Sequence, residues 1–199
     1  KSRVVMLTER LEKVRQTRQQ GRASRQKAAI PTISLVGYTN AGKSTLFNAM
    51  TRAGAYAADQ LFATLDPTSR RLRLPYDQEV IINDTVGFIR QLPKSLMGAF
   101  KATLEEMVDA HLLLHVVDIS NPRFEEQIRA VDRILSDLDL EEIPRILVFN
   151  KIDLIPDEEV APLCRRFEAI AVSAQRRTTF ADLLREMEER CWGEELRSI

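Results

Sequence analysis

Residues 37–44 are GYTNAGKS, and they stand between the apolar run ISLV and the helix-forming segment TLFNAM. They match the pattern G-x-x-x-x-G-K-[ST], whose glycines let backbone N–H groups surround phosphate oxygens. The N-terminus of the following helix adds a partial positive charge. Lys43 is expected to reach the β- and γ-phosphates, and Ser44 to offer its hydroxyl to Mg²⁺. The segment therefore predicts a nucleoside triphosphate site between a strand and a helix.

Short apolar runs alternate with helical patterns from Pro31 onward. Strands are predicted for ISLVG (33–37), RLRLP (71–75), EVIIND (79–84), LLLHVVD (112–118), RILVFN (145–150) and AIAVS (169–173). Helices are predicted at 43–52, 96–108, 124–138, 157–167 and 179–192. This alternation is typical of a mostly parallel sheet with helices on both faces. RLRLP and EVIIND are too close together for a crossover helix, so we expect them to form an antiparallel hairpin.

Asp84 opens the sequence DTVG and is the last residue of the predicted strand EVIIND. A carboxylate at the carboxyl end of such a strand can hold Mg²⁺ directly or through water, and Gly87 can present its N–H to a γ-phosphate. Upstream, the polar segment DQLFATLDPTSRR contains two threonines, Thr64 and Thr68. One of them should close on Mg²⁺ and the γ-phosphate when triphosphate is bound, and release after hydrolysis.

The sequence NKID ends the strand RILVFN and predicts the choice of base. The Asp153 carboxylate can accept hydrogen bonds from guanine N1–H and from the exocyclic amine, a pattern that adenine lacks. Asn150 can contact N7, and the stem of Lys151 can cover the ring. After the last strand, Ser173 and Ala174 lie where a backbone N–H could meet guanine O6. Guanine is favoured over adenine, because buried polar groups reject a ligand that lacks their partners.

Basic charge is concentrated at the N-terminus, although the whole chain has 29 basic and 29 acidic residues and no net charge. Residues 1–29 hold nine Lys or Arg and two Glu, which makes a net charge of +7. Val4, Leu7, Leu11 and Val14 have helical spacing, so an amphipathic helix is predicted, followed by a linker. Such an arm can contact nucleic acid, and a solvated helix face is the alternative.

The start of the chain also bears on where the protein works. It begins at a lysine rather than a methionine, so we expect a fragment of a longer protein. The first thirty residues have no continuous apolar core, and no signal peptide is predicted. No apolar stretch approaches the roughly 18 residues that indicate a membrane span. We therefore expect a cytoplasmic protein without a membrane span.

These motifs, in this order, resemble those of Ras-like P-loop GTPases. Their wording is similar to that of the HflX family of ribosome-associated bacterial GTPases, in the strings VGYTNAGKSTLFN, DQLFATLDPT, DTVGFI, LLLHVVD and NKID. The resemblance implies an α/β fold of the P-loop NTPase class: a Ras-like G domain at 30–199, with a six-stranded, mostly parallel sheet, one antiparallel strand and helices on both faces. Residues 1–29 would then be the remnant of an N-terminal domain.

The same resemblance implies ligands, partners and roles. GTP or GDP with Mg²⁺ would be bound, and Thr64 rather than Thr68 would be the switch threonine. The large ribosomal subunit and its RNA would be the partner, and the task would be to split or rescue ribosomes under stress. Separately from the resemblance, we expect a monomer. The final motif, SAQRRT, lacks the glycine that commonly follows SA in such proteins.

The motifs and the resemblance together define three sets of site residues. The catalytic residues are Lys43, Thr64 and Gly87, and the metal ligands are Ser44, Thr64 and Asp84. The residues that bind nucleotide are Gly37, Tyr38, Thr39, Asn40, Ala41, Gly42, Lys43, Ser44, Thr45, Phe62, Ala63, Thr64, Leu65, Asp66, Asp84, Thr85, Val86, Gly87, Asn150, Lys151, Ile152, Asp153, Ser173, Ala174 and Gln175.

Phe88 occupies the position where Ras-like enzymes carry a glutamine that orients the attacking water. A phenyl ring cannot perform that task, so we expect slow intrinsic hydrolysis that the large subunit accelerates. Asn40 leaves two interpretations open: a K⁺ site beside the phosphates, or stabilisation of the loop alone. Two other functions also stay open, an Obg-type ribosome-assembly GTPase and a nucleotide-gated binding module with negligible hydrolysis.

Overall fold

The structure is a computed structural model, and it describes residues 30–53, 69–85 and 109–196. Residues 1–29, 54–68, 86–108 and 197–199 lie outside the described part. The predicted N-terminal basic helix and the predicted helix at 96–108 fall in these ranges and stay predictions.

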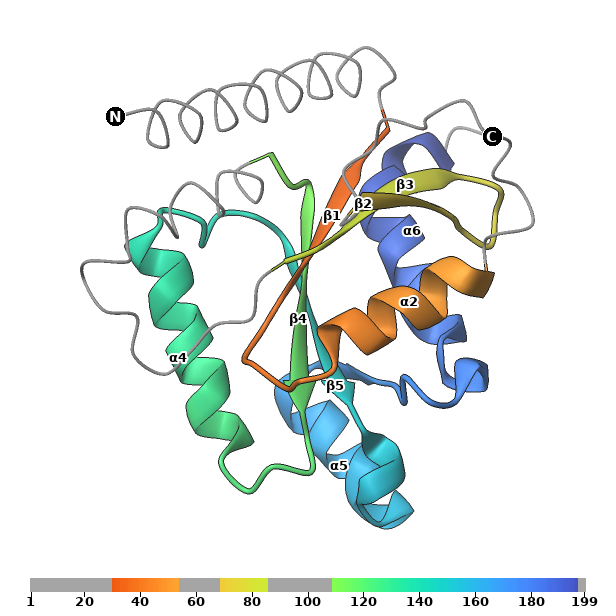
Figure 1. The fold of residues 1–199 in the computed structure, drawn as a ribbon. Coiled ribbons are helices and arrows are strands. Elements are labelled where there is room, and N and C mark those ends of the chain that lie inside the picture. The colour runs from red at the N-terminus through yellow and green to blue at the C-terminus, as the bar shows by residue number, and fades with distance from the viewer. Residues whose placement is uncertain (1–29, 54–68, 86–108, 197–199) are drawn as a thin grey trace, which may run out of the picture.

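A six-stranded sheet forms the centre of the molecule, in the order β2-β3-β1-β4-β5-β6 (Figure 1). Its strands are β1 (Thr32–Val36), β2 (Ser69–Arg73), β3 (Glu79–Asp84), β4 (Leu112–Asp118), β5 (Arg145–Asn150) and β6 (Ala169–Ala171). All neighbouring strands run parallel except β2 and β3, which are antiparallel. The predicted sheet, mostly parallel with one antiparallel hairpin, is confirmed.

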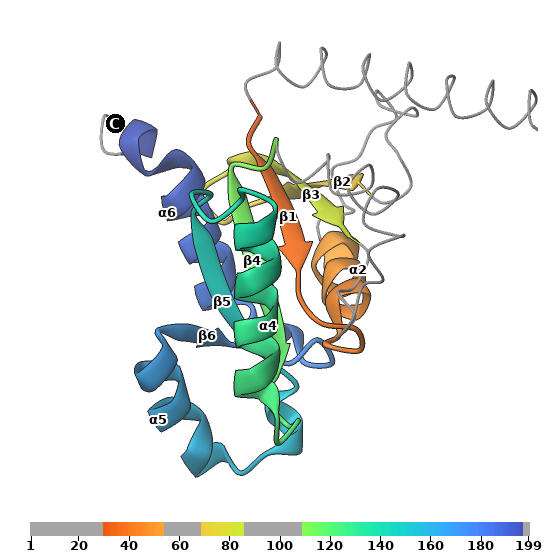
Figure 2. The ribbon, with the colours of Figure 1, turned by 90° about the vertical axis from the view of Figure 1, so that its left-hand side faces the viewer.

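Helices cover both faces of this sheet (Figures 1 and 2). Their bounds are α2 (Lys43–Ala53), α4 (Phe124–Asp137), α5 (Asp157–Phe167) and α6 (Ala181–Leu196). On one face, Leu46 of α2 and Leu183 of α6 share a core cluster with Leu35 of β1. On the other face, Val131 of α4 packs in a separate cluster with Val36 of β1. Residues that are adjacent in β1 thus serve opposite layers, as the alternation of side chains along a strand requires.

β4 lies inside the sheet, between β1 and β5, and every residue from Leu112 to Val117 is buried. Leu114 and Val116 belong to the cluster under α2 and α6, whereas Leu113 belongs to the cluster under α4. A strand that is covered on both faces is expected to be almost continuously apolar. This burial explains why the run LLLHVVD predicts a strand without a polar face.

The predicted and observed boundaries differ most at two elements. β2 is Ser69–Arg73 rather than 71–75, because the chain already turns after Arg73 and the Leu74 N–H bonds the Gln78 carbonyl at 2.8 Å. α6 is Ala181–Leu196 rather than 179–192. It begins later because a short 3-10 helix, Arg177–Thr179, precedes it, and it continues beyond the predicted end.

The carboxyl ends of the parallel strands meet at one edge of the sheet, where α/β folds bind their ligands. Asp84, Asp118 and Asn150 are the last residues of β3, β4 and β5. Asp118 and Asn150 are also direct register partners in the β4–β5 pair. Polar side chains that are far apart in the sequence are therefore brought together at this edge. Among the described helices, none combines the length and the apolar character that crossing a bilayer would need.

Candidate nucleotide-binding site

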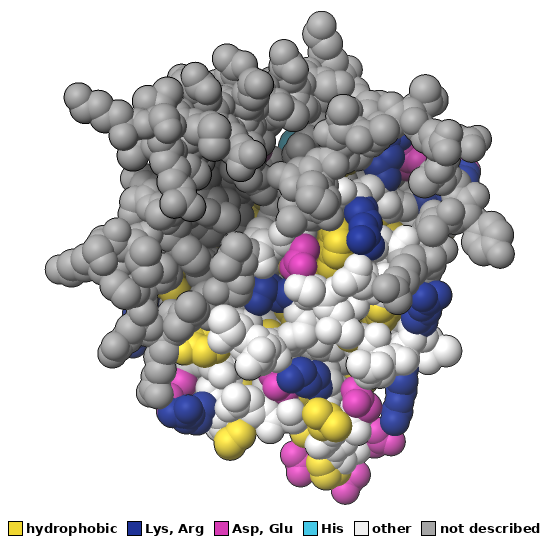
Figure 3. Space-filling view, viewed as in Figure 1, with side chains coloured by type: hydrophobic (Ala, Val, Ile, Leu, Met, Phe, Trp, Pro, Cys, Tyr) yellow, Lys and Arg dark blue, Asp and Glu magenta, His cyan; other side chains and the backbone are white. Residues whose placement is uncertain are grey.

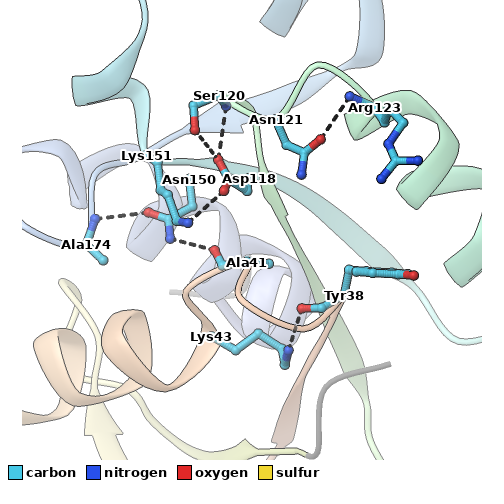
Figure 4. Close-up of polar contacts among 10 residues, drawn as sticks. All are labelled: Tyr38, Ala41, Lys43, Asp118, Ser120, Asn121, Arg123, Asn150, Lys151 and Ala174. Carbon is cyan, nitrogen blue, oxygen red and sulfur yellow. Dashed lines mark hydrogen bonds and ion pairs between the residues drawn. The ribbon is translucent and has the colours of Figure 1, made fainter. Parts of the chain in front are cut away.

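The P-loop leaves β1 at Gly37 and enters α2 at Lys43 (Figure 4). Gly37 has a φ of +147°, and a Cβ there would stand 2.2 Å from the Val116 carbonyl oxygen. Gly42 has a φ of +91°, and a Cβ there would stand 2.3 Å from Asn150 Nδ2. Each position needs glycine twice over, for its backbone conformation and for the close approach of a neighbouring group.

Lys43 is folded back over the P-loop. Its Nζ donates hydrogen bonds to the carbonyl oxygens of Gly37, at 3.0 Å, and Tyr38, at 2.9 Å. Burial lowers the pKa of Lys43, and the negative charge of Asp84 opposes that shift. The ammonium is therefore held inside the loop, where a cation is suited to contact phosphate oxygens.

Asn150 ties the P-loop to the base-reading segments (Figure 4). Its Nδ2 donates to the Ala41 carbonyl at 2.9 Å, and its Oδ1 accepts from the Ala174 N–H at 3.0 Å. The sequence predicts contacts from Asn150 to guanine N7 and from a backbone N–H at Ser173 or Ala174 to guanine O6. In the structure, Asn150 and the Ala174 N–H bond each other. A side-chain amide carries two hydrogens, so the bond to Ala41 leaves one for N7. The N7 and O6 contacts stay predictions.

Asp153 and Ser173 lie together, as the predicted guanine site requires. The Ser173 hydroxyl donates to Asp153 Oδ1, and the Ser173 N–H donates to Thr179 Oγ1 at 2.9 Å. Thr179 in turn donates from Oγ1 to the Arg176 carbonyl at 2.7 Å. These bonds orient the Asp153 carboxylate and hold the loop after β6. Thr179 is not among the site residues predicted from the sequence.

The loop SAQRRT forms without the glycine that commonly follows SA. Among the described residues with a positive φ, none lies in 173–179. A glycine is required only where the backbone must adopt such a conformation or where a neighbour leaves no room for a Cβ. The Thr179 bonds stabilise a loop that ordinary residues can form. Gln175 and the two arginines that follow it are exposed.

Asp118 is a site residue that the sequence analysis did not identify. Its Oδ2 lies 2.6 Å from Lys151 Nζ, and its Oδ1 accepts from the Ser120 N–H at 3.0 Å and from the Ser120 hydroxyl at 2.6 Å (Figure 4). The position of Asp118 at the carboxyl end of a parallel strand was a signal that could have revealed it.

Two of the three predicted metal ligands belong to the described residues. Ser44 is exposed in the first turn of α2, and Asp84 ends β3. Asp84 Oδ1 is buried and has no hydrogen-bond partner among the described residues. A hydroxyl and a carboxylate are hard oxygen ligands of the kind that Mg²⁺ prefers, so the residues present fit the ion. Thr85, the next residue, donates from Oγ1 to the Leu35 carbonyl and anchors the start of DTVG to β1.

Asn40 adopts a left-handed conformation in the P-loop, with a φ of 64°. Asparagine tolerates this conformation better than most residues, which is a backbone reason for its presence that is independent of K⁺. Thr39 and Thr45 are exposed, whereas Tyr38 and Ile152 are half-buried. The remaining predicted site residues, which lie outside the described part, are Phe62, Ala63, Thr64, Leu65, Asp66, Val86 and Gly87.

Comparison with known proteins identifies the family to which the chain belongs. A family profile described as 50S ribosome-binding GTPase matches residues 32–151, from β1 to Lys151. The GTPase HflX of Escherichia coli K12 is 51% identical over 199 residues, which covers 98% of this chain and 46% of that protein. The chain belongs to the HflX family of GTPases. The HflX GTPase of Caldanaerobacter subterraneus subsp. tengcongensis is 48% identical over 194 residues, which covers 98% of this chain and 44% of that protein.

The chain thus spans about half the length of the HflX proteins that it matches, 46% and 44%. A solved structure supports the same fold. It is a GTP-binding protein from Sulfolobus solfataricus in complex with GDP, with a TM-score of 0.65 and 25% identity. The match covers 92% of this chain and 58% of that one. The predicted P-loop GTPase fold is confirmed for this member of the HflX family.

Proposed function

We propose that the chain is the GTP-binding and GTP-hydrolysing part of a switch that acts on the large ribosomal subunit. The observation that carries the choice of guanine is the Asp153 carboxylate, oriented by the Ser173 hydroxyl. Asn150 bonds both the P-loop and the loop that contains Ser173, so base and phosphate sites share one support. The ribosomal partner is supported by the description of the matching family.

The finer parts of the proposal follow the family. We place the protein in the cytoplasm, with ribosome splitting or rescue under stress as its task. We assign residues 1–29 to a basic helical segment, and 30–199 to the G domain. The nucleotide state would then determine how long the protein stays associated with the ribosomal subunit.

Each residue of the site has a proposed part in binding and hydrolysis. Lys43 and the P-loop N–H groups would hold the β- and γ-phosphates, and Asp153 would read the base. Ser44, Asp84 and Thr64 would hold Mg²⁺, which when bound neutralises charge on the β- and γ-phosphates. Gly87 would donate its N–H to the γ-phosphate. Phe88 cannot orient water, so the partner is expected to complete that function.

The test of hydrolysis is GTP turnover by the 199-residue chain, with and without large ribosomal subunits. We expect slow turnover alone and faster turnover with subunits. Lys43→Ala should reduce the stimulated rate by roughly a hundredfold or more, because it removes a charge that faces the reacting phosphates. Phe88→Leu should change the rate little. Running each assay in K⁺ and in Na⁺ tests the proposed K⁺ site near Asn40.

Two results would contradict this proposal. Fast turnover by the isolated chain that collapses on Phe88→Leu would make the ring part of the catalytic apparatus. Binding of GTP without turnover, in K⁺ and with large subunits, would favour the alternative of a nucleotide-gated binding module.

The test of base choice is Asp153→Asn, measured by competition between GTP and xanthosine triphosphate. The amide can donate to the C2 carbonyl of xanthine but no longer accepts both guanine donors. GTP affinity should fall by about a hundredfold or more, and the preference should shift to xanthosine triphosphate. Asp157→Asn, the same change at an exposed position of α5, is the control. Unchanged GTP binding by Asp153→Asn would show that NKID does not read the base.

A further inference from the structure

Asp118 and Lys151 are brought together by the pairing of β4 with β5. Asp118 is the register partner of Asn150, and Lys151 follows Asn150 directly. The Lys151 ammonium lies 2.6 Å from Asp118 Oδ2. Ser120 holds the other carboxylate oxygen through its N–H and its hydroxyl. The carboxylate is therefore fixed at both of its oxygens.

The backbone and the stem of Lys151 are also restrained. Lys151 adopts a left-handed conformation, with φ 66° and ψ 33°, which is rare for a residue with a side chain and persists where the surroundings impose it. Its Cε stands 3.9 Å from the point where a Cβ on Gly42 would lie. The stem thus passes over the P-loop, and its charged end is held by Asp118 on the far side.

The ion pair between Lys151 and Asp118 is partly shielded from solvent. The side chains of Lys151 and Asp118 are 30% and 16% exposed. The side chains of the surface pair Arg185 and Asp182 are much more exposed, at 54% and 80%. Exposed pairs are weakened by water and salt, whereas partly buried pairs are screened less.

We propose that Asp118 is a positioning residue for the nucleotide base. By holding the Lys151 ammonium, it keeps the aliphatic stem extended as a preformed wall for one face of the purine ring. A free lysine side chain samples many rotamers and would lose that freedom on binding, so prior ordering raises affinity. The inference rests on the guanine site proposed above, and it extends that site to a residue on β4.

The first test is Asp118→Asn, with the affinities for GDP, GTP and inosine diphosphate measured by competition. The amide is isosteric and can still accept from Ser120, but it no longer holds the ammonium by charge. We expect a loss of about tenfold, between the effects typical of exposed and of buried ion pairs. The loss should be equal for all three ligands, because they share the purine face. It should be independent of the γ-phosphate and of the exocyclic amine.

A double-mutant cycle separates positioning from a purely structural ion pair. Lys151→Met keeps an apolar stem and removes the ammonium, so Asp118→Asn should cause no further loss of affinity in that background. Asp132→Asn is the matched control, because it breaks the Asp132–Arg145 pair at the opposite end of β5. This control should leave the affinities unchanged. Ser120→Ala is the substitute variant if Asp118→Asn is too unstable to assay. It loosens the Asp118 carboxylate without removing it, so we expect a loss of nucleotide affinity of roughly two- to threefold.

The inference is overturned if Asp118→Asn binds all three ligands normally, or if its loss of affinity is the same with Lys151 and with Met at that position. It is equally overturned if GTP is weakened and GDP is not. Asp153→Asn distinguishes these failures from failure of the proposed function. Altered base preference in Asp153→Asn with normal binding by Asp118→Asn leaves the guanine site standing without this role for Asp118. Unaltered base preference removes the guanine site and this inference with it.

Discussion

His115 is a histidine in the middle of β4 with only 1% of its surface exposed. Its Nδ1 has no hydrogen-bond partner among the described residues. Burial, together with the positive charges of Arg145 and Lys43, lowers the pKa of His115 to about 3. The imidazole is therefore neutral in the folded protein at any ordinary pH, whereas an unfolded histidine takes up a proton below a pH of about 6.5.

This difference between the folded and unfolded pKa of His115 predicts that the fold loses stability in acid through this residue. Its folded-state pKa is depressed, so the contribution to stability is present above pH 6.5 and is lost as the pH falls from there toward 3. Between pH 7.5 and 5.5 the free energy of unfolding should fall by about 1.3 kcal/mol through this one group. His115→Gln does not titrate and should lack that part of the decline. Urea unfolding of both proteins across this range measures it, and parallel pH curves would contradict the prediction.

At the level of elements, the β2–β3 turn is joined to α6 through a buried carboxyl group. The Tyr76 N–H, in the turn, lies 2.9 Å and 3.0 Å from the two carboxyl oxygens of Glu188. Glu188 is fully buried, although the Tyr76 side chain is 61% exposed. An N–H that is buried without a partner is costly, so this contact stabilises the turn that directly follows the last antiparallel pair, Arg73 and Glu79.

Glu188→Ala should therefore destabilise the fold by about 2 kcal/mol, because it leaves the Tyr76 N–H without its acceptor. Glu188→Gln keeps an acceptor oxygen and should cost less. The control is Glu186→Ala on the same helix, which removes only the Arg190–Glu186 pair at the surface and should cost less than about 0.5 kcal/mol. Denaturant unfolding compares the three variants. Equal losses for the two alanine variants would show that the buried contact contributes nothing beyond a surface pair.

The elements were largely predictable from the sequence, because the patterns that define them are local. Alternating apolar runs predicted all six strands, and the glycines and Lys43 of GYTNAGKS predicted the P-loop within a single short segment. The contacts between elements were not predictable in this way. The bond from Lys151 to Asp118 joins residues 33 positions apart, and the bond from Tyr76 to Glu188 joins residues 112 positions apart. Such pairs depend on strand register and helix docking, which local periodicity does not encode.

At the scale of the whole molecule, charge is unevenly distributed along the chain. Residues 1–29 carry a net charge of +7, and the remainder carries −7, which together give the net charge of zero. Figure 3 shows basic and acidic side chains interspersed over the described surface of one face, with acidic side chains gathered toward α5. The first turn of α5 contains Asp157, Glu158 and Glu159. Attraction to RNA phosphates is therefore expected from residues 1–29 rather than from the described surface of this face.

The salt dependence of ribosomal subunit binding tests whether residues 1–29 contact RNA phosphates. Binding of the chain to large ribosomal subunits should weaken steeply as the salt concentration rises, because each phosphate contact releases counterions. Deletion of residues 1–29 should flatten that dependence while leaving GDP affinity unchanged. The measurement is subunit binding at several salt concentrations for both proteins. An unchanged slope would indicate that the segment is a solvated helix face.

The bond between Asn150 and the Ala41 carbonyl spans 109 positions, and Asn150 is bonded in turn by Ala174. Closing a loop of this length has an entropic cost, and the contact cannot form before Asn150 has been synthesised. During synthesis the phosphate loop emerges early, but its support on the base side is made only once β6 and the loop after it have left the exit tunnel. A nascent chain that stops between Asn150 and Ala174 would contain both residues of the bond to the P-loop, but Asn150 Oδ1 would lack its donor from the loop after β6. A bound nucleotide would then stabilise complete chains over unfinished ones, because only a complete chain contains both partners of Asn150.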